Sequence, residues 1–132
     1  MLLVKAILKS SPIHGTGCFA AEDIAKGQVV WRLEPDFDVI IPCDEIPAMP
    51  ESARWFLDTW GYVTEIDGQR VCILCGDHAK HMNHSDTPNC SDIFLDGVSV
   101  NVALRDIAAG EELTCNYYDF DLDVGGKLGQ GA

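Results

Sequence analysis

Residues 83–90, which read Asn-His-Ser-Asp-Thr-Pro-Asn-Cys, and residues 110–117, which read Gly-Glu-Glu-Leu-Thr-Cys-Asn-Tyr, carry more information than the rest of this chain. The first segment is a polar loop rich in turn-forming residues. The second is a glycine turn leading into a short strand that ends on a tyrosine. Near the N-terminus, residues 15–21 read Gly-Thr-Gly-Cys-Phe-Ala-Ala. Two glycines so spaced let a backbone approach a ligand closely, although such a pair alone is more often a plain loop turn.

Together the three segments resemble the signature segments of the SET-domain protein methyltransferases, in the order in which that family carries them. The resemblance implies a mainly β fold of the β-clip type, with several small sheets, one short helix and a knot-like C-terminal segment. It implies a catalytic domain over residues 1–124 and a flexible, glycine-rich tail over residues 125–132. In such a fold the strand ending at Tyr117 passes beneath the preceding loop and lies beside Asn83.

Composition and charge limit the classes to which the chain can belong. A chain of 132 residues, of which 47% are hydrophobic, is typical of one globular domain. No apolar run reaches the roughly 20 residues that cross a bilayer. Residues 1–8 are interrupted by Lys5, which favours a strand over a secretory signal. The net charge of −12 opposes binding to nucleic acid or an anionic membrane and suits a basic protein partner, although acidity also simply keeps small proteins soluble.

Short apolar stretches separated by turn residues predict many short strands. We expect strands at residues 3–8, 28–33, 39–41, 61–65, 70–75, 93–95, 98–104 and 112–116. Asp67-Gly68 and Asp96-Gly97 each predict a two-residue hairpin turn, because these residues tolerate positive φ. Residues 50–60 begin with proline and acid and predict one short helix, whose aromatic side chains we expect in the core. Residues 23–27 and 106–110 are similar and indicate one kind of turn used twice.

The resemblance to the SET family also implies the chemistry. Its members transfer a methyl group from S-adenosyl-L-methionine to a protein lysine, and Tyr117 matches the catalytic tyrosine. The residues expected to hold the cofactor are Gly15, Thr16, Gly17, Asn83, His84 and Phe120. The Asn83 amide would reach the cofactor's amino group, and His84 would reach adenine mainly through backbone atoms. From the residues alone, a tyrosine at a strand end is more often a packing residue, and His84 has the chemistry of a general base.

Cysteine and histidine spacing leaves a zinc site as an alternative. Cys72 and Cys75 form a Cys-x-x-Cys pair that histidines follow at positions 78, 81 and 84. However, residues 71–75 read as one strand, and residues three apart on a strand face opposite sides. We therefore expect no metal. Six cysteines without a signal segment indicate reduced thiols, and so a cytoplasmic protein, or a nuclear one in a eukaryote.

The chain departs from the family pattern in ways that leave its activity open. Many SET proteins complete the substrate channel with a cysteine cluster, and here no cysteine follows Cys115. Tyrosines for the lysine channel are scarce. One candidate strand offers Trp31 but no tyrosine, Ser91 and Asp92 stand where some members have one, and Tyr62 is a loose match. We predict methylation of lysine on a histone-like or ribosomal protein by a monomer or homodimer. An inactive SET-fold binding module and a zinc-stabilised interaction protein are the alternatives.

Overall fold

The structure, a computed structural model, describes residues 1–123 and consists mostly of short strands. The strands are β1 (Ala6–Ser10), β2 (Thr16–Ala20), β3 (Val29–Arg32), β4 (Val39–Pro42), β5 (Tyr62–Ile66), β6 (Gln69–Leu74), β7 (Asn83–His84), β8 (Cys90–Leu95), β9 (Val98–Ala103) and β10 (Thr114–Cys115). The helices are α1 (Glu51–Trp60) and the short 3-10 helices η1 (Cys43–Ala48), η2 (His78–His81) and η3 (Tyr117–Asp119). The predicted tail at 125–132 and the predicted domain end at residue 124 lie outside the described residues.

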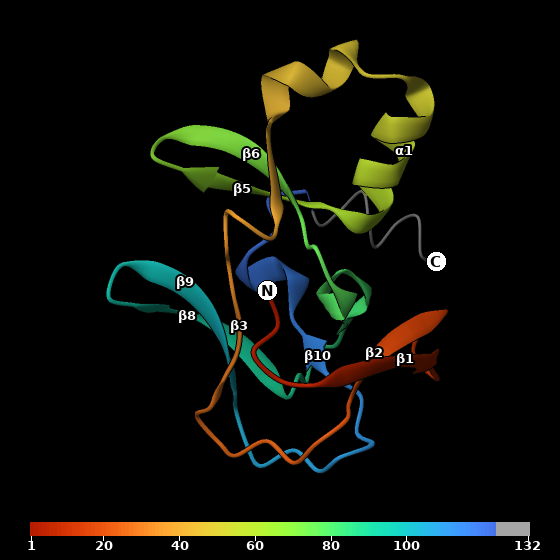
Figure 1. The fold of residues 1–132 in the computed structure, drawn as a ribbon, viewed down its shortest axis with the longest axis vertical. Coiled ribbons are helices and arrows are strands. Elements are labelled where there is room, and N and C mark those ends of the chain that lie inside the picture. Colours follow the sequence, from red (N-terminus) through yellow and green to blue (C-terminus); the bar gives the residue numbers. More distant parts are fainter. Residues whose placement is uncertain (124–132) are drawn as a thin grey trace.

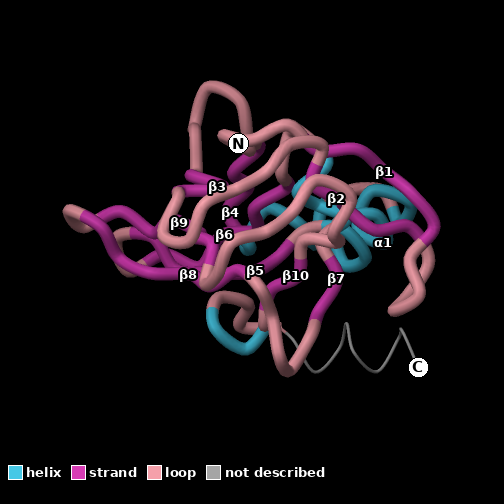
Figure 2. Tube along the Cα trace, turned by 90° about the horizontal axis from the view of Figure 1, so that it is seen from below, coloured by secondary structure: helices cyan, strands magenta, loops and turns pink. Residues whose placement is uncertain are grey.

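The strands form several small sheets instead of one large one. β3, β9 and β8 make one antiparallel sheet, β4, β6 and β5 make a second, β1 pairs with β2, and β7 pairs with β10 in parallel. Figure 1 shows α1 and the sheet of β4, β5 and β6 above, with β3, β8 and β9 and the pair β1–β2 below on opposite sides. In Figure 2, β7 and β10 lie between β8 and β1. This is the mainly β fold that the sequence predicted.

Both predicted hairpin turns are confirmed. Asp67 and Gly68 join β5 to β6 with φ of 51° and 79°, and Asp96 and Gly97 join β8 to β9 with φ of 53° and 77°. Positive φ at both central residues gives a two-residue turn whose twist matches that of the paired strands. The second of these turns fixes the register of β8 against β9, and this strand pair reaches the candidate site described below.

The strand predicted at residues 3–8 is misplaced, because β1 begins only at Ala6. The preceding residues pair elsewhere. Leu2 forms a bridge with Trp31 of β3, and the Leu3 amide donates to the Val30 carbonyl at 2.8 Å. An apolar run in the sequence thus joins two different sheets, which its composition alone does not reveal.

β2 and β10 also differ from the prediction. β2 was expected only as a glycine turn, and its last four residues are all buried, so it lacks the alternation that marks a half-exposed strand. The strand predicted at 112–116 is shortened to β10, because Glu112 forms an isolated bridge with Phe19 of β2 instead. β10 lies beside β7, with Thr114 opposite Asn83, which is the form that the knot-like C-terminal segment takes.

α1 confirms the predicted helix and follows directly on Pro50. The expectation that its aromatic residues lie in the core is wrong for Trp55, which is 63% exposed, and for Phe56, which is 39% exposed. The helix lies at the edge of the molecule (Figure 1), and Leu57 is the residue that it buries. Trp60, at its C-terminal end, packs edge-on against His81, with ring centroids 4.6 Å apart.

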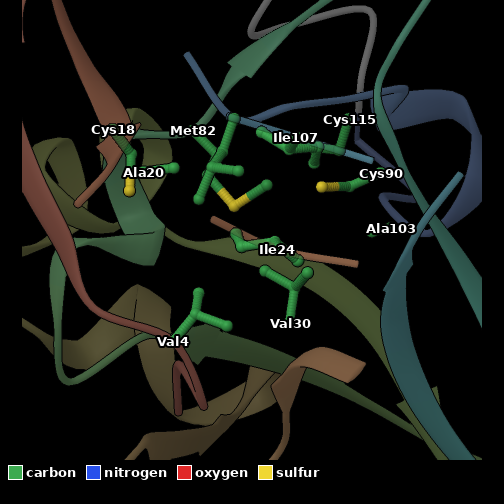
Figure 3. Close-up of a cluster of buried hydrophobic side chains, with 11 residues drawn as sticks. Val4, Cys18, Ala20, Ile24, Val30, Met82, Cys90, Ala103, Ile107 and Cys115 are labelled. Atoms are coloured by element: carbon green, nitrogen blue, oxygen red, sulfur yellow. The ribbon is translucent and has the colours of Figure 1, made fainter. Parts of the chain in front are cut away.

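One cluster of buried side chains joins the sheets (Figure 3). It contains Val4, Cys18, Ala20, Ile24, Val30, Met82, Cys90, Ala103, Ile107, Leu113 and Cys115. Burial raises the pKa of the Cys18 and Cys90 thiols to about 12. Both thiols therefore stay protonated and pack as small apolar groups. All six cysteines lie in the described part of the chain, and none of them forms a disulfide.

The two similar segments, residues 23–27 and 106–110, lie side by side, and we call them the paired turns. Ile24 and Ile107 exchange both backbone hydrogen bonds, each 2.8 Å long, and each side chain is 1% exposed. Figure 1 shows them as orange and blue loops along the bottom of the molecule. The turn that the sequence uses twice therefore forms one contact with itself.

Each of the paired turns also caps the other through its aspartate. The Asp106 carboxylate accepts from the Lys26 amide at 2.8 Å, and the Asp23 carboxylate accepts from the Ala109 amide at 2.9 Å. The two bonds join equivalent positions of the two segments. The similarity of the two segments is thus explained by their reciprocal contact. Neither segment is part of the candidate site.

Candidate active site

The three informative segments of the sequence converge on one cavity of about 450 Å³. Gly15 lines it from the turn before β2, Thr16 from the start of β2, Asn83 and His84 from β7, and Tyr117 from the start of η3. Phe120 lines it as well, directly after η3. Of the seven residues predicted from the sequence, only Gly17 lies outside the lining.

The parallel pairing of β7 with β10 brings Tyr117 to this cavity. Cys115 lies opposite His84, and the chain then turns so that the Tyr117 amide donates to His84 Nδ1 at 3.1 Å. A ring nitrogen that accepts carries no proton, so the proton of the neutral ring lies on Nε2, which is 2.9 Å from an Asp86 carboxylate oxygen. Both ring nitrogens are thus engaged within the chain, and His84 acts as a clamp on the backbone of Tyr117, not as a general base.

Asn83 is buried and held in one orientation by its amide nitrogen. Nδ2 donates to the His14 carbonyl at 3.0 Å and to the Glu112 carboxylate at 2.9 Å. The same carboxylate accepts from the Ser11 hydroxyl at 2.8 Å. With both N–H groups used, the side-chain oxygen of Asn83 is the atom left for a ligand. Glu112 thereby orients a predicted cofactor residue, a role that the sequence reasoning missed although Glu112 stands in a quoted segment.

The two glycines of the turn serve different purposes. Gly15 has φ of +46°, a conformation that favours glycine, and no atom lies within 4 Å of the position a β-carbon would take. A β-carbon on Gly17 would instead clash with a Glu112 carboxylate oxygen. Gly15 therefore opens the turn towards the cavity, whereas Gly17 makes room for the side chain that holds Asn83.

Tyr117 presents its phenol at the cavity in a protonated form. Burial raises its pKa, with smaller contributions from Cys115 and Asp121. The hydroxyl donates to the Met82 carbonyl at 2.7 Å, so its oxygen can still accept a hydrogen bond. Its neighbour Tyr118 is 66% exposed, because β10 ends at Cys115 and the chain continues as a 3-10 helix.

A row of polar side chains lines the cavity from the sheet of β3, β9 and β8. Trp31 lies opposite Asn101, and Asn101 lies opposite Asp92, so the three are neighbours on one face. The Asn101 amide nitrogen donates to the Asp92 carboxylate at 2.9 Å. Trp31 Nε1 and Asn101 Oδ1 are buried and have no hydrogen-bond partner among the described residues. We call Trp31, Asn101 and Asp92 the polar row.

Tyr62, the loose match for a channel tyrosine, also lines the cavity. Its ring packs edge-on against Phe120, with centroids 5.1 Å apart, and against Trp31 at 6.4 Å. Burial raises its pKa, so the phenol is protonated. The aromatic wall formed by these three residues and Tyr117 is large and rigid, which suits the exclusion of water from a ligand.

The zinc alternative requires three or more ligands to converge. Within residues 1–123, no three His, Cys, Asp or Glu side chains are grouped so that they could hold a metal ion. Cys72 and Cys75 are both buried, the former within β6 and the latter just beyond it.

In the described part of the chain, no helix is long and apolar enough to cross a membrane.

Comparison with known protein families matches residues 15–118 to the SET domain. Among curated proteins, the chain is 32% identical over 123 residues to the histone-lysine N-methyltransferase trr of Drosophila melanogaster, covering 89% of this chain and 5% of that protein. It is 31% identical over 116 residues to the histone-lysine N-methyltransferase trithorax of Drosophila virilis, covering 81% and 3%. The chain thus spans only a small fraction of the length of these relatives.

Solved structures share the fold. The Chaetomium thermophilum Polycomb Repressive Complex 2 bound to GSK126 matches with a TM-score of 0.67 and 25% identity, over 96% of this chain and 17% of that chain. Plasmodium falciparum PFL0690c matches with a TM-score of 0.60 and 23% identity, over 88% of this chain and 95% of that chain. The segments around Gly15, Asn83 and Tyr117, the sheets that bring them together and the family match lead to one conclusion: this chain belongs to the SET-domain family.

Proposed function

We propose that this protein methylates a lysine side chain of a basic protein, with S-adenosyl-L-methionine as the methyl donor. The observation that carries the proposal is the convergence of the Gly15 turn, Asn83 and Tyr117 on one cavity in a member of the SET family. The curated relatives named above are histone-lysine methyltransferases. This chain covers only a small part of these relatives, so the acceptor protein is proposed for this chain and is not taken over from them.

The cavity fits a ligand of the cofactor's size and chemistry. Its volume of about 450 Å³ lies within the range of roughly 300–1,000 Å³ for small-molecule sites. The Asn83 oxygen can accept from an amino group, the open turn at Gly15 and Thr16 offers close backbone approach, and Phe120 offers an aromatic face. S-adenosyl-L-methionine supplies a methyl group activated by a positive sulfonium.

The residues around Tyr117 would hold the acceptor amine. A lysine amine is a nucleophile only when neutral, and its ordinary pKa lies near 10.4. The Tyr117 oxygen, with its proton committed to Met82, accepts an N–H of the amine and so orients the lone pair. The aromatic wall keeps water away from the reacting atoms. The net charge of −12 attracts a basic protein, which supports a histone-like or ribosomal acceptor.

The proposal includes a cytoplasmic location, or a nuclear one in a eukaryote, because none of the six cysteines forms a disulfide. It also includes action as a monomer or homodimer, without direct contact to nucleic acid or membrane. Fractionation of the host cells and measurement of the molar mass in solution test these two parts separately from the catalytic part.

Transfer of a labelled methyl group tests the activity. Purified core histones and ribosomal proteins are incubated with labelled S-adenosyl-L-methionine, and the label on lysine is measured for wild type, Tyr117→Phe and the control Tyr118→Phe. We expect Tyr117→Phe to lower turnover about 10²-fold to 10³-fold, the cost of losing one preorganised polar group, and Tyr118→Phe to retain it.

Equal turnover in wild type and Tyr117→Phe would contradict the role of the phenol. Binding of S-adenosylhomocysteine without transfer to any protein would favour the alternative, a SET-fold binding module. That alternative gains support from the scarcity of tyrosines in the cavity, where Trp31 and Asp92 lie in the wall beside Tyr62.

A further inference from the structure

The polar row contains hydrogen-bonding atoms that the chain itself leaves unused. Asn101 donates to Asp92 through its nitrogen, and its oxygen is buried without a partner among residues 1–123. Buried polar atoms in this state are costly unless a ligand or water satisfies them. The row therefore offers two acceptors side by side, a carboxylate and an amide oxygen, in the wall of the cavity that holds Tyr117.

Two adjacent acceptors suit a group that has several hydrogens and a positive charge. A protonated amine has three N–H donors and no acceptor, and a carboxylate beside an amide oxygen satisfies two of them. We propose that Asp92, oriented by Asn101, recognises the substrate amine and takes the proton that the amine must lose before methylation. This inference rests on the proposed function, since it assigns two further residues to the same site.

The proton transfer balances without any other reactant. An N–H bond of the ammonium breaks and leaves its electron pair on nitrogen, while an O–H bond forms on Asp92. One positive and one negative group become two neutral groups, which a buried site favours because burial disfavours charged forms. Burial raises the pKa of Asp92, and Asp119 raises it further, although the hydrogen bond from Asn101 lowers it. The same burial lowers the pKa of an amine, so the two values approach each other.

Several titratable groups face Asp92 in the cavity wall. Four other elements contribute Asn101 of β9, the protonated Tyr62 of β5, Asp119 of η3 and the buried thiol of Cys115 in β10, and its own strand β8 contributes the buried thiol of Cys90. Burial raises the pKa of Tyr62 and of both thiols. The charge that faces Asp92 from another element is therefore the carboxylate of Asp119.

The pH dependence of methyl transfer distinguishes a proton acceptor from a packing residue. Asp92→Asn keeps the shape of the side chain and an oxygen for the Asn101 amide, but it cannot take a proton. We expect its kcat/KM to be at least tenfold below wild type at pH 7.5 and to rise about tenfold per pH unit towards the lysine pKa near 10.4, so that the deficit closes at high pH. Asp67→Asn, in a turn where asparagine also accepts positive φ, is the control and keeps the wild-type profile.

A deficit in Asp92→Asn that is the same at every pH, or no deficit at all, would overturn the inference while leaving the proposed function intact. A second readout needs no turnover. With S-adenosylhomocysteine present, we expect wild type to bind Nα-acetyl-lysine amide at least tenfold more tightly than the norleucine analogue, and Asp92→Asn to lose that preference. If wild type transfers no methyl group yet shows the preference, the proposed function fails and the recognition by Asp92 stands. If wild type shows no preference, the inference is wrong.

Discussion

Glu111 and Glu112 are adjacent in the sequence, yet they contact two regions that differ in whether their polar groups have hydrogen-bond partners within the described chain. Glu111 directly follows the paired turns, where it binds Arg105 at 2.9 Å and accepts from the Ala108 amide at 2.6 Å. Glu112 belongs to the cavity, where it binds Asn83 and Ser11. The turns satisfy their polar groups within the chain, whereas the polar row keeps buried atoms without partners among the described residues. Satisfied groups stabilise the fold, and unsatisfied ones mark where a ligand binds.

The largest expected effect comes from breaking the apolar centre of the paired turns. Ile24→Ala removes a side chain that is 1% exposed, and we expect it to lower the free energy of unfolding by about 2–5 kcal/mol. Ile7→Ala, at a site that is 43% exposed on β1, is the matched control and should cost less than about 0.5 kcal/mol. Urea denaturation measures both, and equal losses would show that the paired turns are not part of the core.

The adjacent glutamates allow the two regions to be separated directly. Glu112→Ala releases the Asn83 amide, and we expect the affinity for S-adenosylhomocysteine to fall about tenfold, the effect of one hydrogen bond to a charged group. Glu111→Ala should leave this affinity unchanged and lower only stability. Calorimetric titration of both variants with S-adenosylhomocysteine measures this difference. An equal loss of affinity in the two variants would show that Glu112 has no special role in the cofactor site.

The reciprocal caps of the paired turns should contribute less than their apolar centre. Asp106→Ala removes the acceptor of the Lys26 amide, and Asp23→Ala removes that of the Ala109 amide. We expect each change to lower stability by about 1 kcal/mol, with methyl transfer unaffected at temperatures where the fold persists. If either variant unfolded at the same temperature as wild type but lost turnover, the paired turns would belong to the active site, and the prediction would be wrong.

The smallest expected effect concerns pH. The side chain of Arg105 holds the pKa of Glu111 below its ordinary value, with help from the Ala108 amide. A carboxylate whose pKa is lower in the folded state adds stability above its ordinary pKa, and that stability is lost as pH falls through the lowered value. Because the pair is exposed, the loss should be small and should shrink with added salt. The free energy of unfolding should therefore fall slightly more between pH 7 and pH 3 for wild type than for Glu111→Ala. An equal fall in the two proteins would contradict a stabilising role of the pair of Glu111 with Arg105.

Local features of the fold could be predicted from the sequence. Of the long-range features, the family resemblance predicted only that the strand before Tyr117 lies beside Asn83. The turns at Asp67-Gly68 and Asp96-Gly97 follow from two residues each, and the family segments identify Asn83, His84 and Tyr117. β2 escaped prediction because burial on both faces erases the alternation of a strand.

The polar row requires the register of three strands to be known before its members become neighbours. The role of Glu112 depends on its contact with Asn83, 29 residues away in the sequence, and the same carboxylate also binds Ser11, 101 residues away. In both cases the sequence contains the right residues, but only the tertiary structure shows which side chain each one meets.

Titration of the folded protein with S-adenosylhomocysteine, by calorimetry on wild type and Asn83→Ala, tests most directly whether this cavity is a cofactor site. We predict one ligand bound per wild-type chain and an affinity at least tenfold weaker in Asn83→Ala, which loses the amide oxygen proposed to accept from the cofactor. A folded wild type that binds no ligand, or an Asn83→Ala variant with undiminished affinity, would contradict the assignment of the site.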